Sequence, residues 1–239
     1  MINQPEALTV EPLVAKGMLY QLLAGGFAYP SAAWQQAYAD GTFARALVEA
    51  AAPIRDDALA ATVVHFRQRL TAGNVENCGL AEEYTFLFAQ QAQVPPYENR
   101  YLPSGPFGQP QGLADVGGFY AAFGFQVEGD MPDHLGAELE FLGALCLKEA
   151  HARQQGWSEQ ADICHQARRR FMAEHLALWL SAFVIRLHEK ARLPFYPALA
   201  KVVEVLVAMD RTELGIAAEG TREARIRPAV PEDDGQCTP

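Results

Sequence analysis

The chain has 239 residues, of which 50% are hydrophobic and 20% are charged, so it carries too much apolar surface for a disordered protein. Its 19 Lys and Arg residues stand against 29 Asp and Glu residues, and the formal net charge of −10 disfavours binding to nucleic acid or to an anionic membrane. A cationic partner is compatible with this charge.

Helical periodicity covers most of the chain, and no window shows the alternation that is typical of half-buried strands. Over residues 10–28, apolar residues recur at steps of three and four, and Pro30 follows them, which predicts a first core helix. Shorter helices are predicted in the rest of the first half, over residues 32–39, 43–52, 56–71 and 76–91.

A long proline-rich loop is predicted between the two halves of the chain. Residues 94–112 contain prolines 95, 96, 103, 106 and 110 together with three glycines, a composition that blocks a helix and favours extended backbone. Loops of this length are often functional, although a plain connector is the alternative. The aromatic residues Tyr97, Tyr101 and Phe107 favour a loop that packs against the rest of the protein.

In the second half, helices are predicted over residues 115–124, 130–154, 158–188 with a bend near Ala173, and 194–209. Asp130 is expected to cap the second of these, with Pro132 in its first turn. The predicted fold class is therefore all-α, a single helical bundle domain over residues 1–211 with the proline-rich loop between its halves. The polar residues 212–239 are expected to form a disordered tail.

The four cysteines contain no CxxC pair, which argues against a zinc ribbon and against a disulfide framework. A set of His and Cys residues in the second half also lacks the short paired spacing of zinc ligands, namely Cys146, His151, Cys164 and His165. We therefore expect no metal and no cofactor. The longest apolar run, residues 176–185, is about half of the roughly 20 residues that cross a bilayer. Residues 1–8 show no export signal, so a cytoplasmic protein is expected.

Two pairs of residues are candidates for binding. Asp133 and His134 stand at the start of the clearest predicted helix, where free amide donors and the helix dipole favour an anion. They either cap this helix or present a hydrogen-bonding pair to a polar or cationic ligand. Tyr84 and Phe88 lie one helical turn apart and belong either to the core or to an apolar groove for a partner peptide.

Four segments, in this order, resemble the TorD/DmsD/NarJ family of redox-enzyme maturation chaperones: EEYTFLF at residues 82–88, PPYENRYL at 95–102, GFYAAFGF at 118–125 and MPDHLGAELEF at 131–141. Their most specific features are Glu98-x-x-Tyr101 and the Pro-Asp-His that precedes Glu138-Leu139-x-Phe141. The resemblance spans about residues 10–210. His134 resembles the branches that serve trimethylamine oxide and dimethyl sulfoxide reductases. Accessory proteins for related dehydrogenases and oxyanion reductases, including those for dimethyl sulfide, ethylbenzene, selenate and chlorate, are equally compatible with the resemblance.

This resemblance implies an all-helical cytoplasmic chaperone that is not an enzyme. Such a chaperone binds the apo catalytic subunit of a molybdopterin-dependent oxidoreductase, together with its twin-arginine leader, and assists cofactor insertion and assembly before export. Molybdenum-cofactor biosynthesis proteins are implied as further partners. By the same likeness, the residues that bind the client peptide are Tyr84, Phe88, Pro96, Glu98, Tyr101, Asp133 and His134.

The chemistry of a twin-arginine leader agrees with these residues. Two guanidinium groups followed by an apolar stretch require carboxylates beside an exposed apolar groove, and we expect Asp133 or Glu98 to bind an arginine through two hydrogen bonds. Two alternatives stay open. One is a small helical enzyme that uses Asp133 and His134 as acid and base, and the other is a permanent accessory subunit of an oxidoreductase complex.

Overall fold

The computed structural model describes residues 7–72, 79–89, 91–102 and 108–217. Within these ranges the chain is helical and contains no β-strand, which confirms the all-α part of the predicted fold class. The helices are α1 (Ala7–Gly26), α2 (Ala32–Ala39), α3 (Thr42–Ala51), α4 (Asp57–Ala72), α5 (Leu80–Phe88), α6 (Gly108–Ala122), α7 (Leu135–Gln154), α8 (Ser158–Phe171), α9 (Ala177–Lys190) and α10 (Phe195–Glu213). None of these described helices combines the length and the apolar character that a membrane crossing requires.

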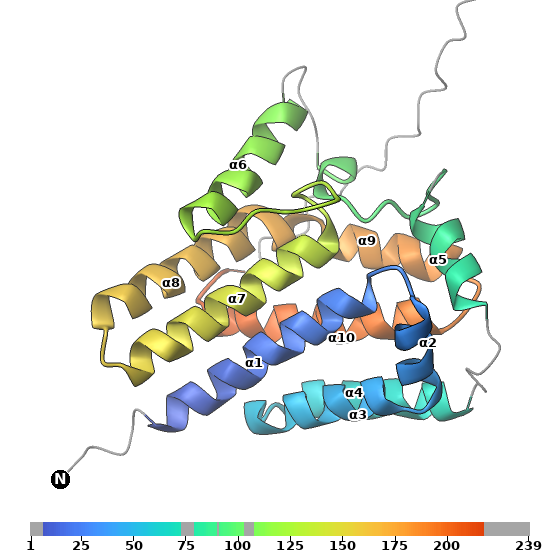
Figure 1. Cartoon of the computed structure of the whole chain (residues 1–239), viewed down its shortest axis with the longest axis horizontal. Coiled ribbons are helices and arrows are strands. Elements are labelled where there is room, and N and C mark those ends of the chain that lie inside the picture. The colour runs from blue at the N-terminus through green and yellow to red at the C-terminus, as the bar shows by residue number, and fades with distance from the viewer. Residues whose placement is uncertain (1–6, 73–78, 90, 103–107, 218–239) are drawn as a thin grey trace, which may run out of the picture.

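The helices α1 and α7 pack side by side along most of their length (Figure 1). Two glycines permit this close approach. A Cβ atom on Gly17 would lie 3.0 Å from the carbonyl oxygen of Gly143, and one on Gly143 would lie 2.9 Å from the carbonyl oxygen of Gly17. Side chains other than hydrogen would therefore separate the two helices. Figure 1 shows α3 and α4 below α1, with α6 above α7 and α8.

Aromatic side chains fill the core where α1, α5, α9 and α10 meet. Phe27 lies edge-on to Phe88 and to Phe183, with ring centroids 6.1 and 6.0 Å away. Phe88 is in turn perpendicular to Tyr196 at 5.0 Å. All four rings are buried, and complete burial of one phenylalanine stabilises the fold by about 1.5–3 kcal/mol. These contacts fix the last turn of α5 to the body.

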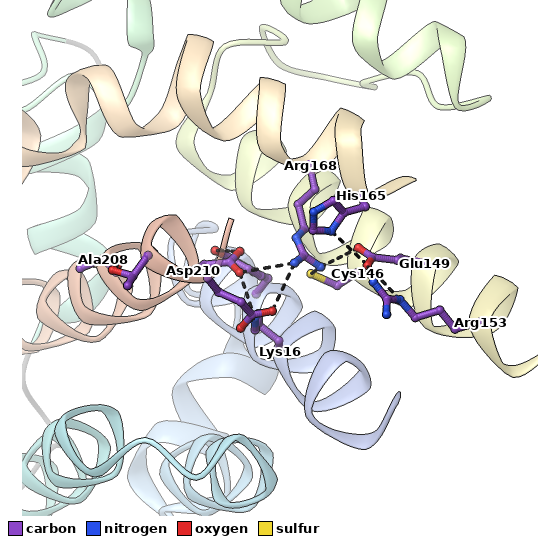
Figure 2. A network of polar contacts seen from close by, with 11 residues as sticks. Lys16, Cys146, Glu149, Arg153, His165, Arg168, Ala208 and Asp210 are labelled. Carbon is purple, nitrogen blue, oxygen red and sulfur yellow. Dashed lines mark hydrogen bonds and ion pairs between the residues drawn. The ribbon is translucent and has the colours of Figure 1, made fainter. Parts of the chain in front are cut away.

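A buried ion network joins α1, α7, α8 and α10 (Figure 2). Lys16 Nζ lies 2.9 Å from Asp210 Oδ1, and a guanidinium nitrogen of Arg168 lies 2.8 Å from Glu149 Oε2. A second nitrogen of Arg168 lies 3.8 Å from Asp210 and so links the two pairs. Burial favours the neutral form of Lys16, but Asp210 and Glu213 raise the pKa of Lys16 above its ordinary value, so this lysine stays charged.

The start of α7 differs from the prediction. The helix begins at Leu135, and His134 caps it, because its Nδ1 accepts a hydrogen bond of 3.0 Å from the Gly136 N–H. The predicted cap at Asp130, with Pro132 in the first turn, is wrong. The physical reason is that residues 132 and 133 form a turn, closed by a hydrogen bond from the His134 N–H to the Met131 carbonyl oxygen, and that His134 itself is extended and pairs with Tyr97 in an isolated antiparallel bridge.

The proline-rich segment is shorter than predicted, because α6 begins at Gly108 rather than near Asp115. Pro110 therefore lies in the first turn of a helix, where a missing N–H costs no intrahelical hydrogen bond. Residues 103–107 lie outside the described residues. The predicted bend near Ala173 is confirmed, since a π-helical turn at Met172–Leu176 separates α8 from α9.

The C-terminal helix is longer than predicted. α10 continues to Glu213, Leu214 is buried, and Gly215 adopts a φ of 63° that permits the Ile216 N–H to bond with the Arg211 carbonyl oxygen. Residues 212–217, which the sequence assigned to the tail, therefore belong to the helical body. The predicted disorder of residues 218–239 lies outside the described residues.

Candidate functional site

Hydrogen bonds anchor the proline-rich segment to the N-terminal end of α7. The Glu98 N–H donates to the Asp133 carbonyl oxygen at 3.0 Å, and the Leu135 N–H donates to the Pro96 carbonyl oxygen at 2.8 Å. The Asn99 N–H donates to Asp133 Oδ2 at 3.0 Å. The side chain of Asp133 thus holds this segment in place, and the residue is only 1% exposed.

Glu98 is buried in the same region and is 6% exposed. Its two carboxylate oxygens lie 3.1 and 3.2 Å from His175 Nδ1, at the π-helical turn. The binding of an arginine by Asp133 or Glu98 stays a prediction, and the structure places both residues below the surface. Both oxygens of Glu98 and Oδ2 of Asp133 are bonded to groups of the protein itself, whereas Asp133 Oδ1 is buried without a hydrogen-bond partner among the described residues.

Glu138, in the first turn of α7, completes this buried acidic cluster. Its Oε2 accepts a hydrogen bond of 3.2 Å from Trp179 Nε1. Burial and the neighbouring Glu98 raise the pKa of Glu138 well above its usual value. Burial also raises the pKa of Asp133, although the Asn99 N–H opposes this shift. Glu138 was part of the sequence motif, but the sequence could not predict that it is buried, because its partner Trp179 lies 41 residues away in the chain.

We expect the variant Glu138→Gln to reduce the dependence of stability on pH. An acid whose pKa is raised on folding stabilises the folded state at low pH, and this contribution is lost as the pH rises above the usual carboxyl range. Glutamine does not titrate, and its oxygen still accepts from Trp179. Urea unfolding at pH 5 and pH 8 should show that the variant gains stability relative to wild type with rising pH, by on the order of 1 kcal/mol. Parallel pH profiles would contradict this assignment.

A groove of about 600 Å³ lies beside the buried cluster, between α1, α5 and α7. Exposed carboxylates and aromatic side chains share its lining: Glu128, Asp130 and Glu140 with Tyr29, Tyr84 and Phe125. Asp130 is held in position, because its Oδ1 accepts hydrogen bonds from the Tyr97 hydroxyl at 3.0 Å and from the Met131 N–H at 2.7 Å. We call this feature the acidic groove.

The aromatic wall of the acidic groove is continuous with the core. Tyr29 is 57% exposed and lies edge-on to Tyr84 at 5.4 Å, and Tyr84 packs on Phe88 at 5.2 Å. His134 also lines the groove, and burial lowers the pKa of its imidazole, which favours the neutral form. The groove therefore presents negative charge and aromatic faces, and His134 adds no positive charge to it.

A second hollow, of about 770 Å³, shares Tyr84 with the acidic groove. Phe88, Tyr97 and Met131 line it together with two cationic side chains, Arg100 and Arg186. A peptide that runs from one hollow to the other would pass from a negative to a positive lining across Tyr84.

The structure thus divides the seven predicted residues into two layers. Tyr84 and His134 line the acidic groove, and Phe88 reaches only the second hollow. The other four line neither hollow: Pro96, Glu98, Tyr101 and Asp133. Tyr101, for example, stacks on Trp179 with ring centroids 5.4 Å apart. Glu128, Asp130 and Glu140 also line the acidic groove, and the sequence analysis did not name them as binding candidates.

Asp133 and His134, the acid and base of the enzymatic alternative, each bond to a different backbone amide. In the part of the chain that the structure describes, no hydrogen bond joins Asp133 to His134, since the first accepts from Asn99 and the second from Gly136. Also among the described residues, no three His, Cys, Asp or Glu side chains come together in a way that could hold a metal ion.

Comparison with known proteins agrees with the sequence resemblance. A family profile described as nitrate reductase delta subunit matches residues 52–184, which is more than half of the chain. The chain belongs to this family. This finding confirms the resemblance to the TorD/DmsD/NarJ chaperones.

Several curated relatives are named as chaperones. The selenate reductase assembly chaperone protein of Thauera selenatis is 36% identical over 144 residues, which cover 57% of this chain and 70% of that protein. The perchlorate reductase assembly chaperone protein of Dechloromonas aromatica is 25% identical over 214 residues, or 86% of this chain and 92% of that protein. The chaperone protein TorD of Aeromonas salmonicida is 27% identical over 156 residues, which cover 62% of this chain and 66% of that protein. These names agree with the prediction of a chaperone that is not an enzyme.

Proposed function

We propose that this protein is a cytoplasmic assembly chaperone for the catalytic subunit of a molybdopterin-dependent reductase. It binds the apo-subunit and its twin-arginine leader, and it assists cofactor insertion before export. The relatives named for selenate and perchlorate reductases favour an oxyanion reductase as the client. The acidic groove is the proposed site for the leader.

The observation that carries this proposal is the convergence of three exposed carboxylates with exposed aromatic faces in one groove. Guanidinium groups bind carboxylates through paired hydrogen bonds, and Asp130 and Glu140 are available for this on the groove wall. Tyr29 and Phe125 offer apolar surface to the hydrophobic part of a leader. The groove therefore matches both chemical halves of a twin-arginine leader.

The residues predicted from the sequence take two different roles in this proposal. Tyr84 and His134 contact the bound peptide directly, with Phe88 as the floor of the adjoining hollow. Pro96, Glu98, Tyr101 and Asp133 form a second layer that positions the groove wall. The arginines of the leader bind the carboxylates of Glu128, Asp130 and Glu140 instead of those of Glu98 and Asp133.

The test is a calorimetric titration with a synthetic twin-arginine leader peptide. The double variant Asp130→Asn/Glu140→Gln is expected to weaken binding about tenfold or more, because charge-assisted hydrogen bonds contribute on the order of 1.5–3 kcal/mol each. Asparagine at position 130 still accepts from Tyr97 and Met131, so the local structure is retained. A Lys-Lys version of the peptide should bind more weakly to the wild type, since lysine lacks the planar fork.

The matched control is Glu159→Gln/Asp162→Asn on α8, which removes the same two charges at exposed positions outside the groove. Equal losses of affinity in the two double variants would show that the binding depends only on net charge and would contradict the proposed site. Detection of this chain in the purified mature reductase would instead favour a permanent subunit.

A further inference from the structure

A basic hollow lies outside the acidic groove. It has a volume of about 440 Å³ and opens between α4, the end of α9 and the start of α10. Among the residues that the structure describes, five basic side chains and no acidic one line it: His65, Arg69, His188, Arg192 and Lys201. Charges of one sign beside a low-dielectric wall concentrate a positive potential, which attracts an anionic group even in a chain of net charge −10.

The positive charges of this basic hollow are only partly neutralised. Lys201 pairs with Glu204 at 2.6 Å. The Arg192 guanidinium lies 3.4 Å over the ring of Phe86, and Arg69 Nε donates to His65 Nε2 at 3.1 Å. Within the described residues, neither arginine makes an ion pair. The two guanidinium groups therefore keep unused donors for a carboxylate ligand.

The rest of the lining is apolar. Phe66 of α4, Leu193 and the prolines 194 and 197 form a hydrophobic wall beside the basic groups. A single small anion would leave this wall uncovered. The hollow therefore fits a peptide that has adjacent carboxylates and a short apolar stretch next to them.

We propose that an acidic segment of this same chain, Glu-Asp-Asp at residues 232–234, docks in the basic hollow. This segment supplies three consecutive carboxylates, and Val230 and Pro231 immediately before it supply the apolar stretch. The carboxylates pair with Arg69 and Arg192, and the apolar residues cover Leu193 and Pro194. The hollow is thus an interaction surface for the C-terminal region.

The length of the connection suits this contact. The hollow lies at the start of α10, a helix of 19 residues that is about 28 Å long, and the described chain ends just beyond its other end. The 15 residues from 218 to 232 lead back from that end. A flexible chain of this length has an average end-to-end distance of about 21 Å and a fully extended reach of about 50 Å. The span lies between these values, so the local concentration of the segment at the hollow is high.

The experiment uses the full chain with a spin label on Cys237, three residues after the acidic segment. Cys146 and Cys164 are buried, and Cys78→Ser removes the remaining thiol. The alanine methyl groups are labelled with isotopes and observed by NMR. If the segment docks, the unpaired electron of the spin label broadens the signals of nearby nuclei, so the signals of Ala191 and Ala198 in the hollow are expected to lose most of their intensity. Ala144, in the acidic groove, serves as the distant reference.

Charge variants decide whether the acidic residues cause this effect. Glu232→Gln/Asp233→Asn/Asp234→Asn and, separately, Arg69→Gln/Arg192→Gln should restore the lost signals, whereas Glu219→Gln/Glu223→Gln should not. A charge exchange, Arg69→Glu/Arg192→Glu combined with Glu232→Lys/Asp233→Lys/Asp234→Lys, should bring the signal loss back. No signal loss in the wild type, or a loss that ignores these variants, overturns the proposal. Signal loss that occurs only when spin-labelled chains are mixed with separate isotope-labelled chains would show that a second copy supplies the segment. That result would overturn docking within one chain.

Discussion

The variant Asp210→Ala is expected to lower the free energy of unfolding by about 3–5 kcal/mol, because it leaves buried cations without their counter-ion. Lys16 is 2% exposed and loses its partner at 2.9 Å, and Arg168 loses a carboxylate at 3.8 Å. The Tyr20 hydroxyl, which donates to Asp210 at 3.0 Å, also loses its acceptor. Urea unfolding monitored by circular dichroism measures the change.

Two controls separate the buried pair from general charge effects. Glu213 also binds Lys16, at 2.6 Å, but its side chain is 55% exposed, so Glu213→Ala should cost only about 1 kcal/mol or less. The double variant Lys16→Met/Asp210→Leu removes both charges, while Arg168 keeps Glu149 at 2.8 Å. This variant should be more stable than Asp210→Ala. If it were less stable, the loss would come from packing rather than from an unpaired charge.

The second large effect is expected at Asp133, on the affinity for a twin-arginine leader peptide. Asp133→Ala removes the acceptor for the Asn99 N–H and should weaken leader binding about tenfold, since a hydrogen bond to a charged group contributes on the order of 1.5–3 kcal/mol. Asp133→Asn keeps that acceptor. It should therefore bind the leader almost as well as the wild type. Calorimetric titration of both variants measures the difference.

The comparison of alanine with asparagine distinguishes two roles for this residue. A carboxylate that contacts an arginine of the leader loses its charge in both variants, so both would bind weakly. A carboxylate that positions the proline-rich segment loses its function only in the alanine variant. Weak binding by Asp133→Asn would therefore contradict the positioning role and restore the direct contact that the sequence predicted.

Periodicity predicted the helical core well, because burial repeats with the helical turn. In the helix predicted over residues 130–154, Leu135, Leu139, Leu142 and Cys146 follow one another at steps of four, three and four, and all four are completely buried. In the helix predicted over residues 158–188, apolar residues at steps of three, one, three and four are also buried, all of them after the predicted bend: Leu176, Trp179, Leu180, Phe183 and Leu187. Such local patterns are visible in a sequence because neighbouring turns carry them.

The site was less predictable, since its geometry depends on contacts between distant residues. Glu98 and Asp133 belong to residue types that are usually exposed, and their burial depends on His175 and on the Asn99 N–H. His175 is 77 residues from Glu98, and no local pattern connects them. The groove carboxylates were missed for a related reason. Glu128 and Asp130 lie in an irregular connection, where periodicity gives no information about which way a side chain points.

The ion network also constrains when the protein can reach its final state during synthesis. Lys16 and Tyr20 belong to the first helix, and both bind Asp210, which is 194 and 190 residues later in the chain. A nascent chain that still lacks α10 has no partner for this lysine. Contacts of such large sequence separation form slowly. The body therefore gains its full stability only after the ribosome has delivered the last helix.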